Sequence, residues 1–278
     1  MTLQEQFIGT HPVAPHIFGL WLSHTDLPTT ERKKHRQLEE DEALCDNAIN
    51  QMAQWIVDYH LTDFDKEIID EQRSILDKHG LSEYIDTLHL LPKAENTQKG
   101  NLGEIVLIEY LKESRGFTSL VRKLTYNPNV EQSMKGDDVL MFHPTNLNSE
   151  VIYGECKFRG TPTANVVGEI VNNLEGNKLL PISMMFVANR LAETGQKDLA
   201  RQIVDLKVAL YNGQVPLTNV GFLISKSSKR KDCGTSAVVD DNLDTSNPRL
   251  VMLSLGVKDP DFFVAEAFRR ADATLKKK

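Results

Sequence analysis

The sequence predicts an α/β fold preceded by a mainly helical, acidic N-terminal region. Apolar residues recur at steps of three and four in several segments, which is typical of amphipathic helices. After Pro92, short apolar and β-branched runs alternate with such segments and indicate strands. A polar stretch, KAENTQKGN, separates the two patterns. We therefore expect an N-terminal region at residues 1–92 and an α/β domain at residues 93–278.

The composition is that of an ordinary globular protein, with 40% hydrophobic and 26% charged residues in a chain of 278. No apolar run approaches the ~18 residues that a membrane-spanning helix needs. The first residues lack the basic start and apolar stretch of a signal peptide. Cys45, Cys156 and Cys233 are widely spaced, which indicates reduced thiols rather than a zinc site. These features predict a cytoplasmic protein.

The net charge of −7 is unevenly distributed along the chain. Residues 1–99 carry 9 Lys and Arg against 18 Asp and Glu, a net charge of −9, whereas residues 100–278 carry 23 against 21, a net charge of +2. Any contact with nucleic-acid phosphates is therefore expected from the second part, where the basic field is modest. Either such binding is weak, or a partner supplies much of it.

The N-terminal region is expected to begin irregularly and to continue as helices. Three prolines break residues 1–38, in which residues 16–21 are a candidate strand. The basic run at residues 31–36 is a candidate phosphate contact, but the acidic residues 39–42 beside it favour a solvated face. Apolar periodicity predicts helices over residues 41–59 and 66–79, the second ending at Gly80.

The next helix is expected over residues 102–112 and carries a notable acid. Glu104 lies three, four and seven residues before Leu107, Ile108 and Leu111, so it belongs to the buried stripe of that helix. A second interpretation is capping. If Asn101 is the N-cap, Glu104 is the third helical residue, where a glutamate closes a capping box and complements the helix dipole.

The remaining chain predicts alternating strands and helices. Their expected positions are a strand near 119–125, a hairpin formed by 139–142 and a strand beginning at 151, a helix at 163–174, a buried strand at 182–187, a helix at 191–211, strands at 215–225 and 250–255, and a closing helix at 261–275. The polar segment 225–248 is expected to be a mobile loop. Its basic residues are either a DNA contact or solvated charges: Lys226, Lys229, Arg230 and Lys231.

The hairpin carries an unusual arrangement of charge. Two acids stand at the head of its first strand, and Glu155-Cys156-Lys157 lies in its second. Strand alternation places Glu155 and Lys157 on one face and Cys156 on the other. Such a set suits metal-assisted phosphodiester hydrolysis, in which carboxylates hold Mg²⁺ and a lysine positions the attacking water. The alternative, which this short pattern alone favours, is a salt bridge at a strand end.

The order of the elements along the chain favours the metal site over the salt bridge. That order resembles the core of the PD-(D/E)XK nuclease superfamily. It consists of a helix with an inward glutamate, a strand, an Asp-headed strand, a Glu-x-Lys strand, a helix and a strand. This resemblance implies a restriction-endonuclease-like mixed sheet flanked by helices. It also implies a Mg²⁺ site, at which Mn²⁺ can substitute, and a catalytic set matching that superfamily's motif: Glu104, Asp138, Glu155 and Lys157.

The roles that the resemblance implies differ among these residues. Glu104, Asp138 and Glu155 would be the metal ligands, and Lys157 would orient the attacking water. No proline precedes the aspartate, and Lys135-Gly136-Asp137-Asp138 instead resembles a Gly-x-Asp variant. Asp137 therefore remains a competing candidate for the metal ligand.

Three segments, KGNLGEIVLIEYL, KGDDVLMF and VIYGECKFRG, also resemble the central blocks of the HamA family, the nuclease-like subunits of Hachiman anti-phage systems. The resemblance covers about residues 90–260. It implies a bacterial cytoplasmic protein, DNA as substrate and a helicase partner (HamB-like) in a heteromeric complex. Such a partner would account for the modest basic field of this chain.

Two classes of function therefore compete. The first is a Mg²⁺-dependent DNA nuclease working with a helicase, in which Arg159 is a candidate phosphate contact and Asn165 and Asn172 are weaker substrate candidates. The second is a catalytically weak, nuclease-derived subunit that binds DNA or its partner. The acid cluster favours the first, because mutual repulsion makes unpaired acids costly unless a metal or a proton relieves it. The acidic composition argues against a restriction-type nuclease acting alone.

Overall fold

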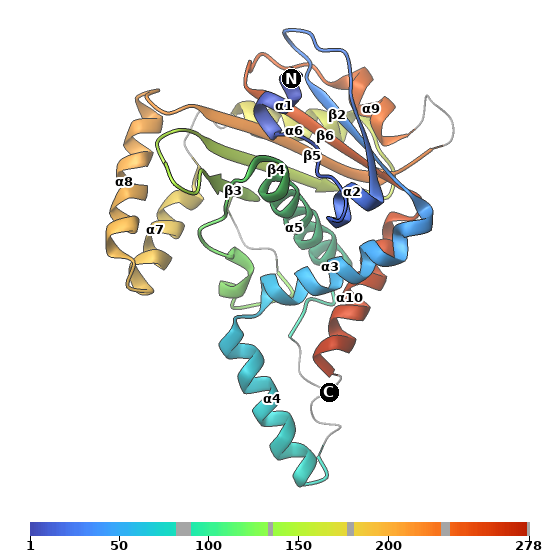
Figure 1. Ribbon diagram of the computed structural model, residues 1–278, viewed down its shortest axis with the longest axis vertical. Helices are drawn as coiled ribbons and strands as arrows, with labels where there is room; N and C mark the ends of the chain where they lie inside the picture. Colours follow the sequence, from blue (N-terminus) through green and yellow to red (C-terminus); the bar gives the residue numbers. More distant parts are fainter. Residues whose placement is uncertain (82–89, 133–135, 177–180, 229–233, 277–278) are drawn as a thin grey trace.

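The computed structural model describes residues 1–81, 90–132, 136–176, 181–228 and 234–276. Its centre is a six-stranded mixed sheet in the order β1-β2-β6-β5-β4-β3, flanked by helices (Figure 1). The predicted α/β class, the mixed sheet and the mainly helical N-terminal region are confirmed. The strands are β1 (Leu22–Asp26), β2 (His35–Glu40), β3 (Val139–Phe142), β4 (Val151–Phe158), β5 (Leu217–Lys226) and β6 (Leu250–Val257).

The sheet combines two antiparallel hairpins with a parallel centre. β1 pairs with β2 and β3 pairs with β4 in antiparallel fashion, while the pairs β2–β6, β6–β5 and β5–β4 are parallel. Strands from residues 1–92 and from residues 93–278 therefore lie in one sheet. The predicted hairpin is confirmed, and its first strand, β3, forms one edge of the sheet.

Helices cover both faces of the sheet. The helices are α1 (Leu3–Ile8), α2 (Ile17–Trp21), α3 (Cys45–His60), α4 (Asp63–Lys78), α5 (Glu95–Arg115), α6 (Ala164–Gly176), α7 (Ser183–Glu193), α8 (Lys197–Tyr211), α9 (Thr235–Asn242) and α10 (Pro260–Lys276), with short 3₁₀ turns η1 (Glu42–Leu44) and η3 (Lys123–Tyr126). None of the helices in these ranges is long and apolar enough to span a membrane.

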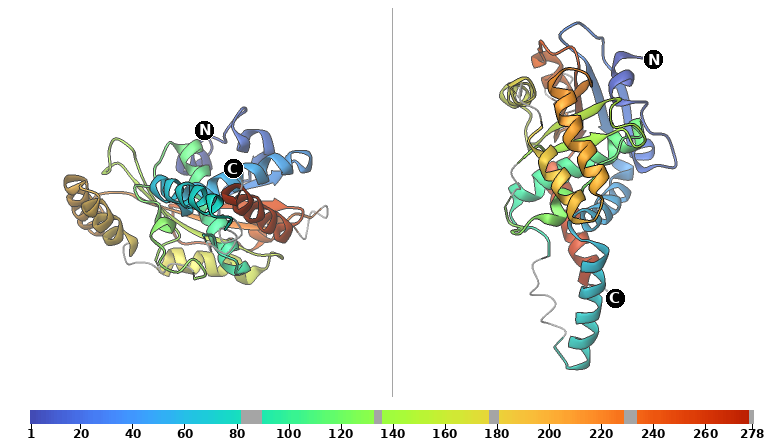
Figure 2. Two further views of the ribbon diagram at one scale, coloured as in Figure 1. Left: turned by 90° about the horizontal axis from the view of Figure 1, so that it is seen from below. Right: turned by 90° about the vertical axis from the view of Figure 1, so that its left-hand side faces the viewer.

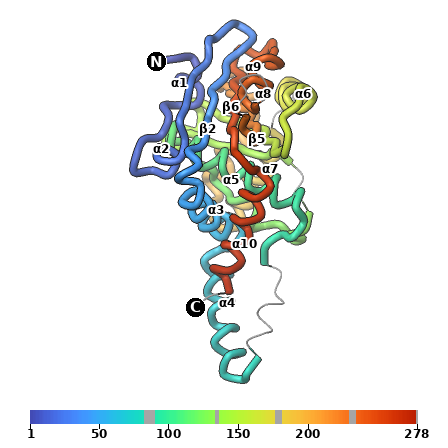
Figure 3. The backbone as a smooth tube through the Cα atoms, turned by 90° about the vertical axis from the view of Figure 1, so that its right-hand side faces the viewer, coloured from blue at the N-terminus to red at the C-terminus, as the bar shows by residue number. Residues whose placement is uncertain are grey.

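The helices form three hydrophobic clusters with the sheet. The largest joins α3, α5 and α10 to one face, and a second joins α6 and α9 to the other. Figure 3 shows α3 and α6 on opposite sides of the strands. A third cluster joins the α7–α8 pair to β3, and Figure 2 shows these two helices side by side. The free edge of the sheet at β3 therefore lies close to α5 on one side and α7 on the other.

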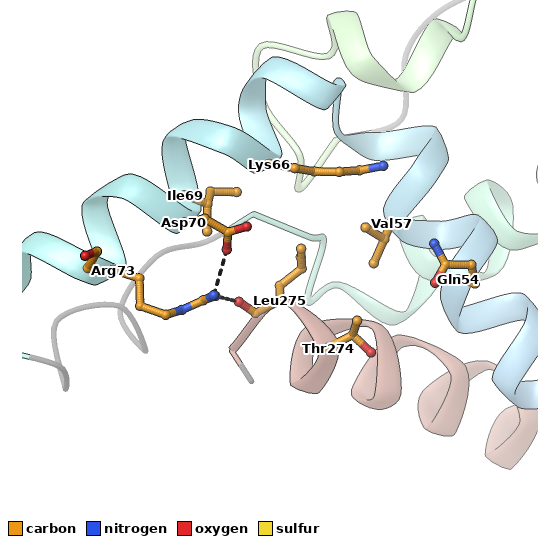
Figure 4. Close-up of a pocket in the computed structure, with 9 residues that line it drawn as sticks. Gln54, Val57, Lys66, Ile69, Asp70, Arg73, Thr274 and Leu275 are labelled. Atoms are coloured by element: carbon orange, nitrogen blue, oxygen red, sulfur yellow. Dashed lines mark hydrogen bonds and ion pairs between the residues drawn. The ribbon is translucent and has the colours of Figure 1, made fainter. Parts of the chain in front are cut away.

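Helix α4 projects away from the sheet (Figures 1 and 3). Ile69 joins it to the largest hydrophobic cluster, and a polar contact lies beside a hollow between α3, α4 and α10 (Figure 4). There the Arg73 guanidinium donates to the backbone carbonyl of Leu275, and its Nη1 lies 2.8 Å from Asp70 Oδ1. The contact with Leu275 ties the projecting helix to the end of α10, whereas the Asp70 contact lies within α4.

The basic run at residues 31–36 is only in part the solvated face that the sequence favoured, since Glu31 and Arg32 are exposed. His35 and Arg36 are completely buried in β2. Burial is tolerated because the Arg36 guanidinium is paired, with Nε 2.6 Å from Asp26 Oδ1 and Nη1 donating to the carbonyl of Gly9. Charge patterning in the sequence could not show these partners, which come from other segments.

Several predicted elements were wrong. Residues 17–21 form a helix, and the strand follows it. Residues 119–125 form no strand: Thr118 makes an isolated bridge to Phe142 and η3 follows. The predicted strand at 182–187 is the first part of α7, in which buried residues recur at helical spacing. The expected single helix at 191–211 is broken at Gly195, whose φ of +84° favours glycine.

The polar segment 225–248 contains more structure than expected, because it includes the helix α9. Lys229, Arg230, Lys231 and Cys233 lie outside the described residues, as does Lys135 of the hairpin motif. Cys45 and Cys156 are free thiols.

Candidate active site

The β3–β4 hairpin brings two carboxylates together at the edge of the sheet. Val139 is opposite Gly154, so Asp138 and Glu155 are neighbours at the next position and share a face. The backbone N–H of Cys156 donates to Asp138 Oδ2 at 2.9 Å. Burial raises the pKa of Asp138, and the negative charge of Glu155 raises it further. The ionised form of Asp138 is therefore disfavoured unless a proton or a cation offsets its charge.

Glu155 and Lys157 lie on the same face of β4. Glu155 Oε1 is 2.5 Å from Lys157 Nζ and also accepts, at 2.8 Å, from the Asn173 side chain of α6. Cys156 lies on the opposite face, in the cluster formed with α5. The alternation along this strand is as predicted.

Gly103 sets the position of Glu104. A Cβ atom at Gly103 would lie 2.6 Å from Cys156 Sγ, so only a residue without a side chain allows α5 to approach β4 this closely. The next residue is Glu104, which is thereby carried to the edge at which Asp138 and Glu155 meet. Its side chain is only 12% exposed and lies 2.8 Å from Lys123 Nζ.

The capping interpretation of Glu104 is wrong. Helix α5 starts at Glu95 with Ala94 as N-cap, so the polar stretch after Pro92 is largely helical and Glu104 lies in the middle of the helix. Burial raises the pKa of Glu104 to about 7, and the charges of Asp138 and Glu155 act in the same direction while Lys123 opposes them. Glu104, Asp138 and Glu155, here called the acid cluster, therefore interact with one another.

The two adjacent aspartates have different surroundings. The Asp137 N–H donates to Ser183 Oγ at 3.0 Å, and the Ser183 N–H donates back to Asp137 Oδ2 at 2.7 Å. This reciprocal pair anchors the start of α7, where a carboxylate also complements the helix dipole. Asp137 thus has a structural partner, whereas the carboxylate of Asp138 faces Glu155. This difference favours Asp138 over Asp137 as a metal ligand.

Lys157 is held in its charged form. Burial lowers its pKa, but the hydrogen bond that Lys157 donates to Glu155 and the charges of Glu155 and Asp138 outweigh burial and raise it. An ammonium that keeps its proton at neutral pH is a donor and not a general base. Its chemistry is therefore to orient a water molecule or to stabilise negative charge.

The weaker candidates lie at the margin of the site. Arg159 is 47% exposed and 3.6 Å from Glu169, and Asn165 and Asn172 are exposed on α6. Asn173 instead contacts Glu155. Asn173 is exposed like Asn172, so its place on the predicted helix did not distinguish it. Lys123 was missed because it was expected in a strand.

The donor set suits a hard divalent cation. Among the described ranges, no three His, Cys, Asp or Glu side chains are arranged as they stand to hold a metal ion. Mg²⁺, however, commonly takes one or two carboxylates together with waters and substrate phosphates. Asp138 and Glu155 meet that requirement with oxygen ligands, and Glu104, now paired with Lys123, is a third carboxylate nearby. The residues present therefore fit a magnesium or manganese site.

A second reactive-looking group is structural. His35 Nε2 lies 2.7 Å from Ser254 Oγ, and His35 Nδ1 lies 3.7 Å from Asp240 Oδ1, an order that resembles a hydrolase relay. Ser254 and His35 are completely buried within the sheet. No substrate reaches a serine in that position, so the group links β2, β6 and α9.

Comparison with known proteins agrees with the resemblance seen in the sequence. The family model described as HamA matches residues 15–271. A curated relative, the Hachiman protein HamA of Bacillus cereus, is 40% identical over 275 residues, which cover 99% of this chain and 97% of the relative. The match includes the helix with Glu104 and the whole β3–β4 hairpin. The chain therefore belongs to the HamA family.

Proposed function

We propose that this chain is the Mg²⁺-dependent DNA nuclease subunit of a bacterial anti-phage defence complex and acts in the cytoplasm with a helicase partner (HamB-like). The observation that carries the proposal is the acid cluster. Three carboxylates come from α5, the head of β3 and the middle of β4, and burial together with their mutual repulsion raises the pKa of Glu104 and Asp138. The name of the curated relative, a Hachiman protein, supports the defence context.

Each residue of the site has a distinct role in this proposal. Asp138 and Glu155 hold the metal, and Glu104 binds it directly or through water. Asn173 fixes the Glu155 carboxylate through Oε1. Lys157, with its raised pKa, donates to the attacking water or to the phosphate oxygen that gains charge. Bound Mg²⁺ supplies the polarisation of the phosphate and of the water.

The charge distribution supports a division of labour with a partner. The net charge of +2 over residues 100–278 is small for a protein that must hold DNA by itself. Arg159, exposed two residues beyond Lys157, is the nearest candidate for a phosphate contact. A helicase that holds the DNA would deliver it to the acid cluster without requiring a strongly basic surface here.

One observation favours the second candidate function, a catalytically weak binding subunit. Glu104 is paired with Lys123 and Glu155 with Lys157 in the structure, so these acids have cation partners without a metal. A subunit that had lost catalysis would keep such pairs as ordinary salt bridges. The experiment below separates the two functions.

The test is DNA cleavage by the complex purified with its native partner. Linear, circular and single-stranded DNA are incubated with and without Mg²⁺. We expect cleavage only with the metal, and its loss in a Glu155→Ala, Lys157→Ala double variant that still folds and binds the partner. Asp198→Ala with Arg201→Ala, which removes an exposed ion pair on α8, is the matched control. Unchanged cleavage by the first double variant would reject the catalytic assignment.

A further inference from the structure

The ammonium of Lys123 lies among the oxygen atoms of the candidate site. Its Nζ is 2.8 Å from Glu104 Oε2 and 3.0 Å from the backbone carbonyl oxygen of Asp137. The side chain is 14% exposed and comes from η3, which belongs to neither α5 nor the hairpin. The same positive charge opposes the rise in the pKa of Asp138 that burial and Glu155 cause, so its influence extends to a second member of the acid cluster.

The atoms around this ammonium are also ligands for a divalent cation. Carboxylate and carbonyl oxygens are the groups that bind Mg²⁺, Mn²⁺ and Ca²⁺ in proteins. A lysine ammonium is a compact point charge that can balance acids but cannot polarise a phosphate as a metal does. Lys123 therefore balances the negative charge of the acid cluster. Without it, acids would lie close together with little solvent to reduce their repulsion.

Lys123 occupies Glu104 Oε2, so a metal ion that binds this oxygen must replace the ammonium there. The ammonium holds the Glu104 carboxylate and stands beside the cavity that Glu104, Asp137 and Asp138 line with it. Within the part of the chain that the structure describes, three acids do not yet converge on one point. Release of Glu104 from Lys123 is the rearrangement that would add a third carboxylate.

We propose that Lys123 is a built-in counter-ion that takes the place of the divalent cation beside Glu104 and is displaced when the metal binds. This inference rests on the proposed function, because it assumes the metal site at the acid cluster. It assigns Lys123 to the regulation of that site. The lysine keeps the cluster stable without metal, and loading of the site requires exchange of one cation for another.

The test measures the accessibility of Lys123 in the full chain without DNA. Lysines are acetylated with a limiting amount of a water-soluble ester, with and without saturating Mn²⁺, and each site is quantified by mass spectrometry. Calorimetry in the same buffer records Mn²⁺ binding. Lys99 is the internal control, since it is 15% exposed and its Nζ lies 2.7 Å from Asp261 Oδ1. We expect Mn²⁺ to raise acetylation of Lys123 several-fold and to leave Lys99 unchanged.

A Glu104→Gln variant provides a second measurement. Without the carboxylate, Lys123 should react rapidly in the absence of metal, and Mn²⁺ should add little. Should that variant fail to fold, the comparison within the wild-type chain still decides. Mn²⁺ binding with no change at Lys123, or an equal rise at Lys99, would overturn the inference and leave the proposed nuclease standing. Absence of Mn²⁺ binding together with absence of cleavage would instead reject the metal site itself.

Discussion

Gly103 of α5 lies directly against Cys156 of β4, so that a Cβ atom on the glycine would be 2.6 Å from the cysteine sulfur. Each of the two residues is next in sequence to residues of the candidate site. Glu104 follows Gly103, and Glu155 and Lys157 surround Cys156. Gly103 has no side chain, and burial raises the pKa of the Cys156 thiol, so neither residue is suited to act on a substrate. Their packing determines how far the helix carboxylate stands from the hairpin carboxylates.

Gly103→Ala should therefore displace α5 from β4. We expect a loss of about 1–3 kcal/mol in the free energy of unfolding, the usual cost of overpacking a core. Cleavage per folded molecule should fall as well, because Glu104 moves with the helix. Urea denaturation and a cleavage assay measure the two effects. Adding Cys156→Ala removes the sulfur that the new methyl group meets, so the double variant should recover much of the stability. Failure to recover would place the strain elsewhere.

The hairpin and the inward glutamate could be predicted because local rules determine them. Alternation in β4 separates Cys156 from Glu155 and Lys157, and helical periodicity placed Glu104 on the buried side of its helix. The start of that helix could not be predicted, because KAENTQKGN is polar and has turn-like composition. In the structure it is helical to Glu95, which excludes the capping interpretation of Glu104.

Residues whose partners are distant in the sequence were beyond prediction. The apolar run at 182–187 fits a strand or a helix by composition, and packing against β3 selects the helix α7. Arg36 looked like part of a solvated basic run because its partner Asp26 lies on the neighbouring strand. Lys123 reaches Glu104 from a 3₁₀ turn, and no local pattern indicates that contact.

The raised pKa of Glu104 predicts a pH dependence of stability. Because this carboxyl has a pKa of about 7 in the folded chain, the folded state binds more protons than the unfolded state between about pH 4.5 and pH 7. Its contribution to stability is therefore lost as the pH rises through that window. Glu104→Gln cannot titrate. The difference in unfolding free energy, wild type minus variant, should fall by about 2–3 kcal/mol from pH 5 to pH 8.

Urea unfolding of both proteins without metal, at several pH values, measures this difference. Parallel pH profiles of the wild type and Glu104→Gln would contradict the assignment of a raised pKa to Glu104. The comparison does not depend on the absolute stability of the variant, because only the change of the difference with pH is used.

Asn173 should act by positioning Glu155. Its side chain donates to Glu155 Oε1 at 2.8 Å, and a hydrogen bond to a charged group is typically worth about 1.5–3 kcal/mol. Asn173→Ala should therefore lower cleavage about tenfold or more and raise the Mg²⁺ concentration that half-saturates cleavage. Asn172→Ala, at the neighbouring position of α6, which is exposed as Asn173 is, is the matched control and should behave like the wild type. Equal effects of the two substitutions would remove Asn173 from the site.

Asp137 and Asp138 should give opposite results when each is replaced by asparagine. Asp137 accepts from the Ser183 N–H at the start of α7, and Asp137→Asn keeps an acceptor oxygen but loses the charge, so it should cost about 0.3–1 kcal/mol of stability while cleavage per folded molecule largely remains. Asp138→Asn removes a carboxylate that burial and Glu155 destabilise, so the fold should be unchanged or more stable while cleavage is lost. Thermal unfolding measures the stability of each variant, and Mg²⁺-dependent cleavage measures its activity. The reverse pattern, with cleavage lost only in Asp137→Asn, would show that the metal ligand is Asp137 and that Asp138 serves the hairpin.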